Sequence, residues 1–248
     1  MGIVTQKHRV SLKSHINGYT EMICQSSVKI KRDSTPVDAE RREDVLDLVA
    51  QNVTALSMIH PPVDHPRFGA YCAALHMEIY SYLDMDGPHR MELVTVYVDG
   101  VMAGFTLCGL PLNGTLSECG IYYTAVKKEL RGNGLMSLMM KDIIERYTSA
   151  ALSCDVALVP LYERFGFRCK SVRLGQIVMF LGNPVEDTPI WSTHEIMNHP
   201  SVVAQRLKDE AKSSAYELGR ADRAFAKRMK AAEDNAKRFL QISKVRYR

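Results

Sequence analysis

The chain has 248 residues, of which 46% are hydrophobic and 24% charged, and its formal net charge is +4. This composition excludes an intrinsically disordered chain, and the length allows one full-sized domain with an appendage or two small domains. There is neither a run of about 18 apolar residues nor an apolar stretch at the N-terminus, so we expect no membrane-spanning segment and no secretory signal.

Six cysteines and eight histidines are scattered along the chain without the spacing of a zinc site. His60 and His65 flank a Pro-Pro pair, but no further metal ligands accompany them. We therefore expect reduced, mostly buried thiols, no metal, and a cytoplasmic location or one within a larger particle assembled in the cytoplasm.

The sequence divides into four parts. We interpret residues 1–27 as an N-terminal extension and residues 28–182 as one globular domain. A linker at 183–198 and a basic helical tail at 199–248 follow.

The domain opens with an alternating pattern at residues 28–31 that predicts a strand. Apolar residues at helical spacing predict a helix over 36–57. Prolines at 61, 62 and 66 then break the chain, and a second apolar stripe predicts a helix over 67–83.

The clearest hairpin follows. Residues 93–98 and 101–107 are apolar, β-rich runs joined by Asp99-Gly100, a favoured two-residue turn because both positions tolerate positive φ. A third strand at about 117–126 completes a predicted antiparallel meander.

Residues 131–134 read Arg-Gly-Asn-Gly and stand between this third strand and a helical pattern that opens at Leu135. The start of a helix presents free backbone N–H groups and the positive end of the helix dipole, which together bind anions. The two glycines allow close approach of the backbone, and the arginine adds charge. Since Gly-x-Gly pairs also occur in ordinary turns, the loop alone leaves both interpretations open.

Beyond the loop, the patterns predict a helix over 135–148, a strand over 151–154, a helix over 158–165 and a final strand over 169–181. These elements complete a mixed sheet with helices on both faces.

Residues 161–167 read Leu-Tyr-Glu-Arg-Phe-Gly-Phe, a short helix closed by glycine. With the loop at 131–134, this segment makes residues 28–182 resemble the GNAT superfamily of N-acetyltransferases. That family has a Gln/Arg-x-x-Gly-x-Gly/Ala loop for the pyrophosphate of CoA and a Leu-Tyr-x-x-x-Gly-Phe element beside the thioester. One departure is Glu129, which stands where Gln or Arg is usual.

The resemblance implies an α/β (α+β) GNAT fold, with a central mixed, mostly antiparallel sheet and helices on both faces. It also implies acetyl-CoA as acyl donor and a primary amine, on a protein or a small molecule, as acceptor. The cofactor-binding residues that it implies are Ala125, Val126, Arg131, Gly132, Asn133, Gly134, Leu135 and Asp155. Asp155 falls where many relatives carry Asn, and an aspartate can accept a hydrogen bond there but cannot donate one.

The resemblance also implies two catalytic residues. Glu118, at the start of the strand before the loop, corresponds to a general base, although a solvated glutamate at a hairpin end fits the sequence equally well. Tyr162 corresponds to the acid that protonates the CoA thiolate, with a packing role beside Phe165 and Phe167 as its alternative.

The acceptor site is not identified by any motif. Asp64, His65, Tyr71 and Glu78 lie in the region that shapes this site in relatives, and each also fits an ordinary surface or core position.

The tail at residues 199–248 has 13 Lys and Arg against 6 Asp and Glu. Its apolar residues recur every three or four positions, which predicts one long amphipathic helix or two helices with a break near Gly219.

Two other functions therefore compete with acyl transfer. One is a structural or assembly subunit, for example of a virion or a multiprotein complex, in which the tail binds a protein partner or a second copy. The other is nucleic-acid binding through residues 220–248. Asp222, Glu233 and Asp234 interrupt the basic run, so a solvated helix face explains it as well.

Overall fold

The computed structural model describes residues 6–16, 19–87, 91–112, 117–184 and 190–246. The chain forms two compact units, each discontinuous in sequence. Unit one comprises residues 1–48, 82–150 and 184–189, and unit two comprises 49–81, 151–183 and 190–248. The mixture of helices with a mostly antiparallel sheet, and the long C-terminal helix, confirm the predicted fold class.

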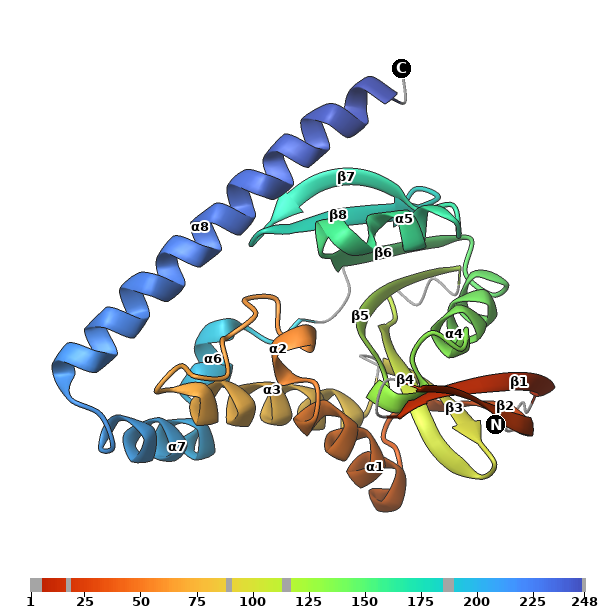
Figure 1. Cartoon of the computed structure of the whole chain (residues 1–248), viewed down its shortest axis with the longest axis horizontal. Helices are drawn as coiled ribbons and strands as arrows, with labels where there is room; N and C mark the ends of the chain where they lie inside the picture. The colour runs from red at the N-terminus through yellow and green to blue at the C-terminus, as the bar shows by residue number, and fades with distance from the viewer. Residues whose placement is uncertain (1–5, 17–18, 88–90, 113–116, 185–189, 247–248) are drawn as a thin grey trace. The chain divides into compact units, whose positions relative to one another are not determined.

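Unit one is built on five strands that are hydrogen-bonded in chain order, and every neighbouring pair is antiparallel (Figure 1). The strands are β1 (Gln6–Ile16), β2 (Tyr19–Ser34), β3 (Met91–Val98), β4 (Val101–Gly109) and β5 (Glu118–Val126). The predicted meander is confirmed as β3, β4 and β5. Residues 6–16 and 19–27, interpreted as part of an extension, form β1 and the first part of β2.

The turn between β3 and β4 has the predicted geometry. Asp99 and Gly100 have φ values of 49° and 88°, so both are left-handed. The Asp99 carboxylate also accepts a hydrogen bond from the backbone N–H of Ser27 at 2.8 Å, which ties the turn to β2. The residue types of the turn and the pairing of the strands therefore favour the same hairpin.

The helices of unit one are shorter than predicted. The helix expected over 36–57 is two helices, α1 (Ala39–Ala50) and α2 (Val53–Leu56), and the second belongs to unit two. The helix expected over 135–148 is α4 (Leu135–Ile144), preceded by the short 3₁₀ helix η1 (Lys128–Leu130). Helix α4 packs against β3, β4 and β5.

A buried cluster of charges fixes α4 to the sheet of unit one. The Asp142 carboxylate, 1% exposed, accepts hydrogen bonds from Arg32 Nε on β2 at 2.8 Å and from Arg146 Nη2 at 3.0 Å. Arg146 also pairs with Glu92 on β3, and Tyr147 donates to the same Glu92 oxygen at 3.2 Å. The cluster therefore joins the helix to two strands.

Unit two has three strands in the order β6, β8, β7, together with the remaining helices. Its elements are α3 (Phe68–Leu83), β6 (Ser149–Cys154), η2 (Val156–Leu158), α5 (Val159–Glu163), β7 (Arg168–Arg173), β8 (Gln176–Leu181), α6 (Thr193–Met197), α7 (Pro200–Glu210) and α8 (Ala215–Arg246). The boundary between the units falls inside α3, after Ser81, and inside β6, before Ala151. The helix predicted over 67–83 is confirmed by α3.

The single strand predicted over 169–181 is wrong, because a tight turn divides it into β7 and β8. Leu174 and Gly175 form this turn with φ values of 50° and 82°. Leucine rarely adopts a left-handed conformation, so Leu-Gly carries little of the signal that Asp99-Gly100 carries.

The tail forms two helices, but the predicted break near Gly219 is wrong. The break falls at residues 211–214, and Gly219 lies inside α8. Ser214 opens α8 with a capping box: its Oγ accepts from Glu217 N at 3.2 Å, and its own N–H donates to the Glu217 carboxylate at 2.8 Å.

Helix α8 lies along the hairpin of β7 and β8 within unit two (Figure 1). The Gly175 N–H donates to the Glu233 carboxylate at 2.6 Å, and a Cβ on Gly175 would lie 3.0 Å from that of Ala232. Farther along, Phe225 packs edge-on against His65 and Tyr71, with centroids 5.6 and 5.8 Å away.

A second polar contact of unit two ties the Pro-rich connection to the strands. His60 Nδ1 lies 2.8 Å from the Thr54 carbonyl oxygen, and Nε2 lies 2.9 Å from Asp155 Oδ1. Both partners are acceptors, which favours the protonated ring, and the Gln176 side-chain amide nitrogen also lies 3.3 Å from Nε2. The hydrogen bond to Asp155 raises the pKa of His60 and lowers the pKa of Asp155.

Over the described ranges, no helix combines the length and the apolar character needed to cross a bilayer.

Replacement of Asp142 by Asn should destabilise unit one by about 3 kcal/mol, because two arginines lose a buried charged partner. The measurement is urea unfolding followed by circular dichroism. Glu145→Gln, on an exposed residue that follows α4, is the control and should stay within about 0.5 kcal/mol of wild type. Equal midpoints for the two variants would contradict an anchoring role.

The contribution of the His60–Asp155 contact to stability should depend on pH. Since the folded pKa of His60 is raised, its contribution is complete below about pH 6.5 and is lost as the pH rises through the folded value. The difference in melting temperature between wild type and His60→Gln should therefore be largest near about pH 5.5 and shrink by about pH 8. His76→Gln, at an exposed position, should show no such trend, and a pH-independent difference for His60→Gln would disprove the protonated pair.

Candidate functional site

The loop at residues 131–134 has the geometry of an open anion-binding turn. It joins η1 to α4, and its two glycines, Gly132 and Gly134, have φ values of 79° and 78°. A Cβ built on either glycine would have no heavy atom within 4 Å. Space beside the backbone is therefore open at both glycines.

The loop is held by its own hydrogen bonds. The Leu130 and Arg131 N–H groups donate to the Lys127 and Lys128 carbonyls at 2.9 and 3.3 Å. The Asn133 side-chain amide donates to the Leu130 carbonyl at 3.1 Å. Within the described ranges, no hydrogen bond engages the N–H of Gly132 or Gly134. The loop therefore keeps its conformation without hydrogen bonds from these two backbone amides.

Charge around the loop is mixed but predominantly positive. Arg131 and Lys128 are exposed and Lys127 is partly buried, while Glu129 is exposed. The first turn of α4 adds N–H groups that have no partner inside the helix. Three cations and a helix start against one carboxylate favour an anion here.

Ala125 and Val126 end β5 directly before this loop. Both are buried, and they pair with Phe105 and Gly104 on β4. The Val126 carbonyl accepts from Arg131 Nε at 3.2 Å, which holds the arginine against the end of the strand. A Cβ on Gly104 would lie 2.7 Å from the Ala125 carbonyl oxygen, so glycine is needed opposite this strand end.

Glu118 is partly buried and is the first residue of β5. Nine residues of extended strand separate the two ends of β5 by about 27 Å. Glu118 and the loop therefore lie toward opposite ends of the same strand.

Residues nearer the loop were missed by the sequence analysis. The pairing of β4 with β5 shifts between Leu107 and Cys108, which makes Tyr122 the extra residue of a β-bulge. Bulges redirect side chains and are frequent beside active sites. The Tyr122 ring fills the space over Gly109 and packs edge-on against Tyr82, with centroids 5.4 Å apart. No local sequence signal marks a bulge, because it arises from the register of two strands.

Tyr162 belongs to unit two, where it lies in α5 and is 8% exposed. Its ring packs edge-on against Phe167 with centroids 6.0 Å apart, and its carbonyl accepts from the Phe167 N–H across the Gly166 turn. Burial raises the pKa of the Tyr162 hydroxyl, so this phenol keeps its proton throughout the neutral range.

Asp155, also in unit two, precedes η2 and is half-exposed. Its carboxylate is paired with His60, and this hydrogen bond lowers its pKa. Asp155 is therefore an ionised acceptor rather than a donor. From the sequence, His60 was expected only as a candidate metal ligand, and its pairing with Asp155 could not be foreseen because 95 positions separate the two residues.

The four residues considered for an acceptor site differ in exposure. His65 is 4% exposed between Tyr71 and Phe225, and its Nδ1 accepts from the Arg67 N–H at 3.1 Å. Burial lowers the pKa of His65, which suits a neutral packing residue. Asp64 is exposed and Glu78 is partly buried. In the described part of the chain, no cluster of three or more His, Cys, Asp or Glu side chains could hold a metal.

Comparison with known proteins agrees with the sequence motifs. Residues 61–167 match the family model described as the acetyltransferase (GNAT) family. No protein with curated annotation matches the sequence.

Several solved structures are similar to this chain. PaiA N-acetyltransferase from Thermoplasma acidophilum, in complex with coenzyme A, shares 10% identity over 61% of this chain and 99% of its own, with a TM-score of 0.45. A putative GNAT acetyltransferase from Desulfovibrio desulfuricans shares 17% identity over 62% and 98%, with a TM-score of 0.44. An acyl-CoA N-acyltransferase from Pseudomonas aeruginosa shares 18% identity over 61% and 98%, with a TM-score of 0.42.

The family match rests on sequence and includes both the loop at 131–134 and the segment at 161–167. Residues 61–167, which include both motifs, are therefore similar to the acetyltransferase (GNAT) family.

Proposed function

We propose that this protein transfers an acetyl group from acetyl-CoA to a primary amine. The observation that carries the proposal is the open loop at residues 131–134, with two left-handed glycines before α4, inside the family match. A diphosphate is an anion of the size and charge that such a loop binds. The family supports acyl transfer in general, whereas the acetyl group and the amine belong to the proposal.

In this proposal, the cofactor-binding residues of unit one divide into two groups. The main chain of Arg131 through Leu135 receives the diphosphate, and the Arg131 guanidinium adds positive charge. The main chain at Ala125 and Val126 receives the pantetheine arm in the manner of an added strand. In unit two, the ionised Asp155 carboxylate is positioned by His60 to accept from an amide N–H of the cofactor.

The reaction forms a C–N bond at the thioester carbonyl and breaks the C–S bond. The amine loses a proton, which we assign to Glu118 through a bridging water, and the departing thiolate gains one, which we assign to Tyr162. The raised pKa of Tyr162 suits a donor that must remain protonated before the C–S bond breaks. General acid–base roles of this kind contribute about a hundredfold each.

Replacement of Gly134 by Ala should weaken CoA binding at least tenfold, because the new Cβ occupies the open space that the diphosphate needs. Gly100→Ala is a closely matched control: Gly100 has φ 88° and also no heavy atom within 4 Å of an added Cβ, but it lies in the β3–β4 turn. Both variants carry the same backbone strain, about 1–2 kcal/mol. Isothermal titration of both variants with CoA distinguishes an effect of backbone strain, which the two variants share, from an effect on the cofactor-binding loop, which only Gly134→Ala has.

Equal losses of affinity in Gly134→Ala and Gly100→Ala would show that the loop is not part of the CoA-binding site. Failure of the wild-type protein to bind CoA at millimolar concentration would instead favour the structural or assembly subunit.

Replacement of Tyr162 by Phe should lower turnover about a hundredfold while the dissociation constant for acetyl-CoA stays unchanged, because only the proton donor is lost. Thiol release from acetyl-CoA, measured with a lysine peptide, an N-terminal peptide and a diamine as acceptors, gives the rate. Glu118→Gln should give a fall of similar size. The rate of the wild-type enzyme should not decline through ionisation of Tyr162 below about pH 10, since burial raises its pKa.

Unchanged turnover in Tyr162→Phe would leave this tyrosine with only its packing against Phe167. For Glu118, the same result would transfer the role of base to a residue nearer the loop, and Tyr122→Phe is then the variant to measure.

A further inference from the structure

The acidic residues that interrupt the basic run of α8 are mostly paired within unit two. Asp222 accepts from Arg67 Nη1 at 2.7 Å and lies 3.4 Å from His65 Nε2. Glu233 accepts from the Gly175 N–H at 2.6 Å. Asp222 is therefore paired with a cation outside α8, whereas Glu233 also lies 3.3 Å from Lys237 Nζ within the helix.

What remains on the exposed side of α8 is strongly basic. Between residues 219 and 241, seven cationic residues and one anionic residue, Asp234, are exposed, and the Asp222 side chain, 46% exposed, is paired with Arg67. The seven cations form what we term the basic face: Arg220, Arg223, Lys227, Arg228, Lys230, Lys237 and Arg238.

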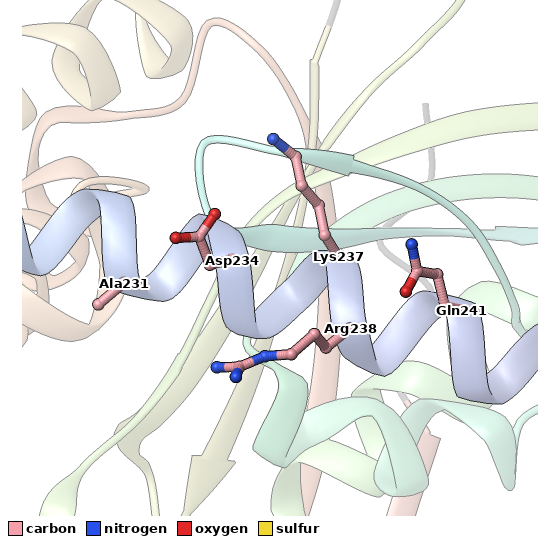
Figure 2. Close-up of a pocket in the computed structure, with 5 residues that line it drawn as sticks. All are labelled: Ala231, Asp234, Lys237, Arg238 and Gln241. Carbon is pink, nitrogen blue, oxygen red and sulfur yellow. The ribbon is translucent and has the colours of Figure 1, made fainter.

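The basic face is long and fixed to a packed body. At 1.5 Å per residue it spans about 27 Å from Arg220 to Arg238. Toward its C-terminal end, Ala231, Asp234, Lys237, Arg238 and Gln241 line a shallow hollow, and the side chains of Lys237 and Arg238 leave the helix in opposite directions (Figure 2). Cations held along a rigid helix are suited to a regular array of negative charges.

The chemistry of the face discriminates among polyanions. A helix that lies on a membrane exposes a wide apolar face, but on α8 the large exposed apolar residues are Tyr216 and Ile242, one near each end. Single strands require aromatic side chains for base stacking, and residues 219–241 expose none. The major groove of B-form DNA admits an α-helix, whereas the deep, narrow groove of A-form RNA does not.

We propose that the basic face of α8 binds the phosphate backbone of double-stranded DNA without reading its sequence. Affinity then comes from neutralised phosphates and released counterions, so it must fall steeply with salt.

The test uses the full chain and a labelled 30-base-pair duplex of random sequence, with fluorescence anisotropy at about 50 to 200 mM salt. The slope of log K against log salt should lie between about −4 and −6, because each neutralised phosphate contributes about −0.9. The triple variant Arg223→Gln, Lys227→Gln, Lys230→Gln should reduce this slope by about 2 to 3 and weaken binding at least tenfold at 100 mM salt. Glutamine preserves helix propensity, and circular dichroism checks the fold.

A control variant that loses the same number of charges distinguishes an effect of the basic face on DNA binding from an effect of the net charge of the protein. Lys141→Gln, Lys208→Gln, Lys212→Gln removes the same charge from exposed positions outside α8 and should leave the slope unchanged. Asp234→Asn should strengthen binding a few-fold, since it removes an exposed anion that lies among the cations.

Four results would overturn the proposal: no duplex binding at 50 mM salt, equal losses in the two triple variants, tighter binding of a single strand or an RNA duplex of the same length, or preferential binding to phosphatidylserine vesicles. CoA titration of the same variants should give wild-type affinity, so the DNA proposal and the proposed acyl transfer fail or succeed separately.

Discussion

The buried carboxylate of Asp142 is the contact on which the geometry of unit one depends. It joins α4 to β2 through Arg32, and Arg146 extends the cluster to Glu92 on β3. The loop at residues 131–134 is continuous with the first turn of α4. A helix anchored by charge-assisted hydrogen bonds therefore fixes the direction in which the loop presents its amides.

In unit two, carboxylates that accept hydrogen bonds hold helices to the rest of the unit. The Asp209 carboxylate on α7 caps the start of α3 by accepting from the Ala70 N–H at 2.8 Å, and Asp222 and Glu233 hold α8 to the same unit. Acidic residues of the tail are thus used for internal docking, which leaves the lysines and arginines to face solvent. A count of charges along the sequence cannot show this division, because it depends on which helix face packs.

Local chemistry explains what the sequence predicted correctly. Asp99-Gly100 and the glycines at 132 and 134 adopt left-handed conformations that their residue types favour, so the hairpin and the loop could be foreseen. Leu174 adopts the same conformation against its preference, and the turn between β7 and β8 was missed. The bulge at Tyr122, the Asp142 cluster and the His60–Asp155 contact all join residues distant in sequence, which neither periodicity nor motifs reveal.

The central claim is that the main chain around Gly132 and Gly134 binds the diphosphate of CoA. Backbone amide chemical shifts recorded during a CoA titration test it most directly, because a hydrogen bond to a phosphate oxygen moves the amide proton itself. The account predicts that Gly132, Asn133 and Gly134 show the largest downfield shifts, with smaller changes in the first turn of α4. Saturable CoA binding that leaves these three amides unmoved would contradict it.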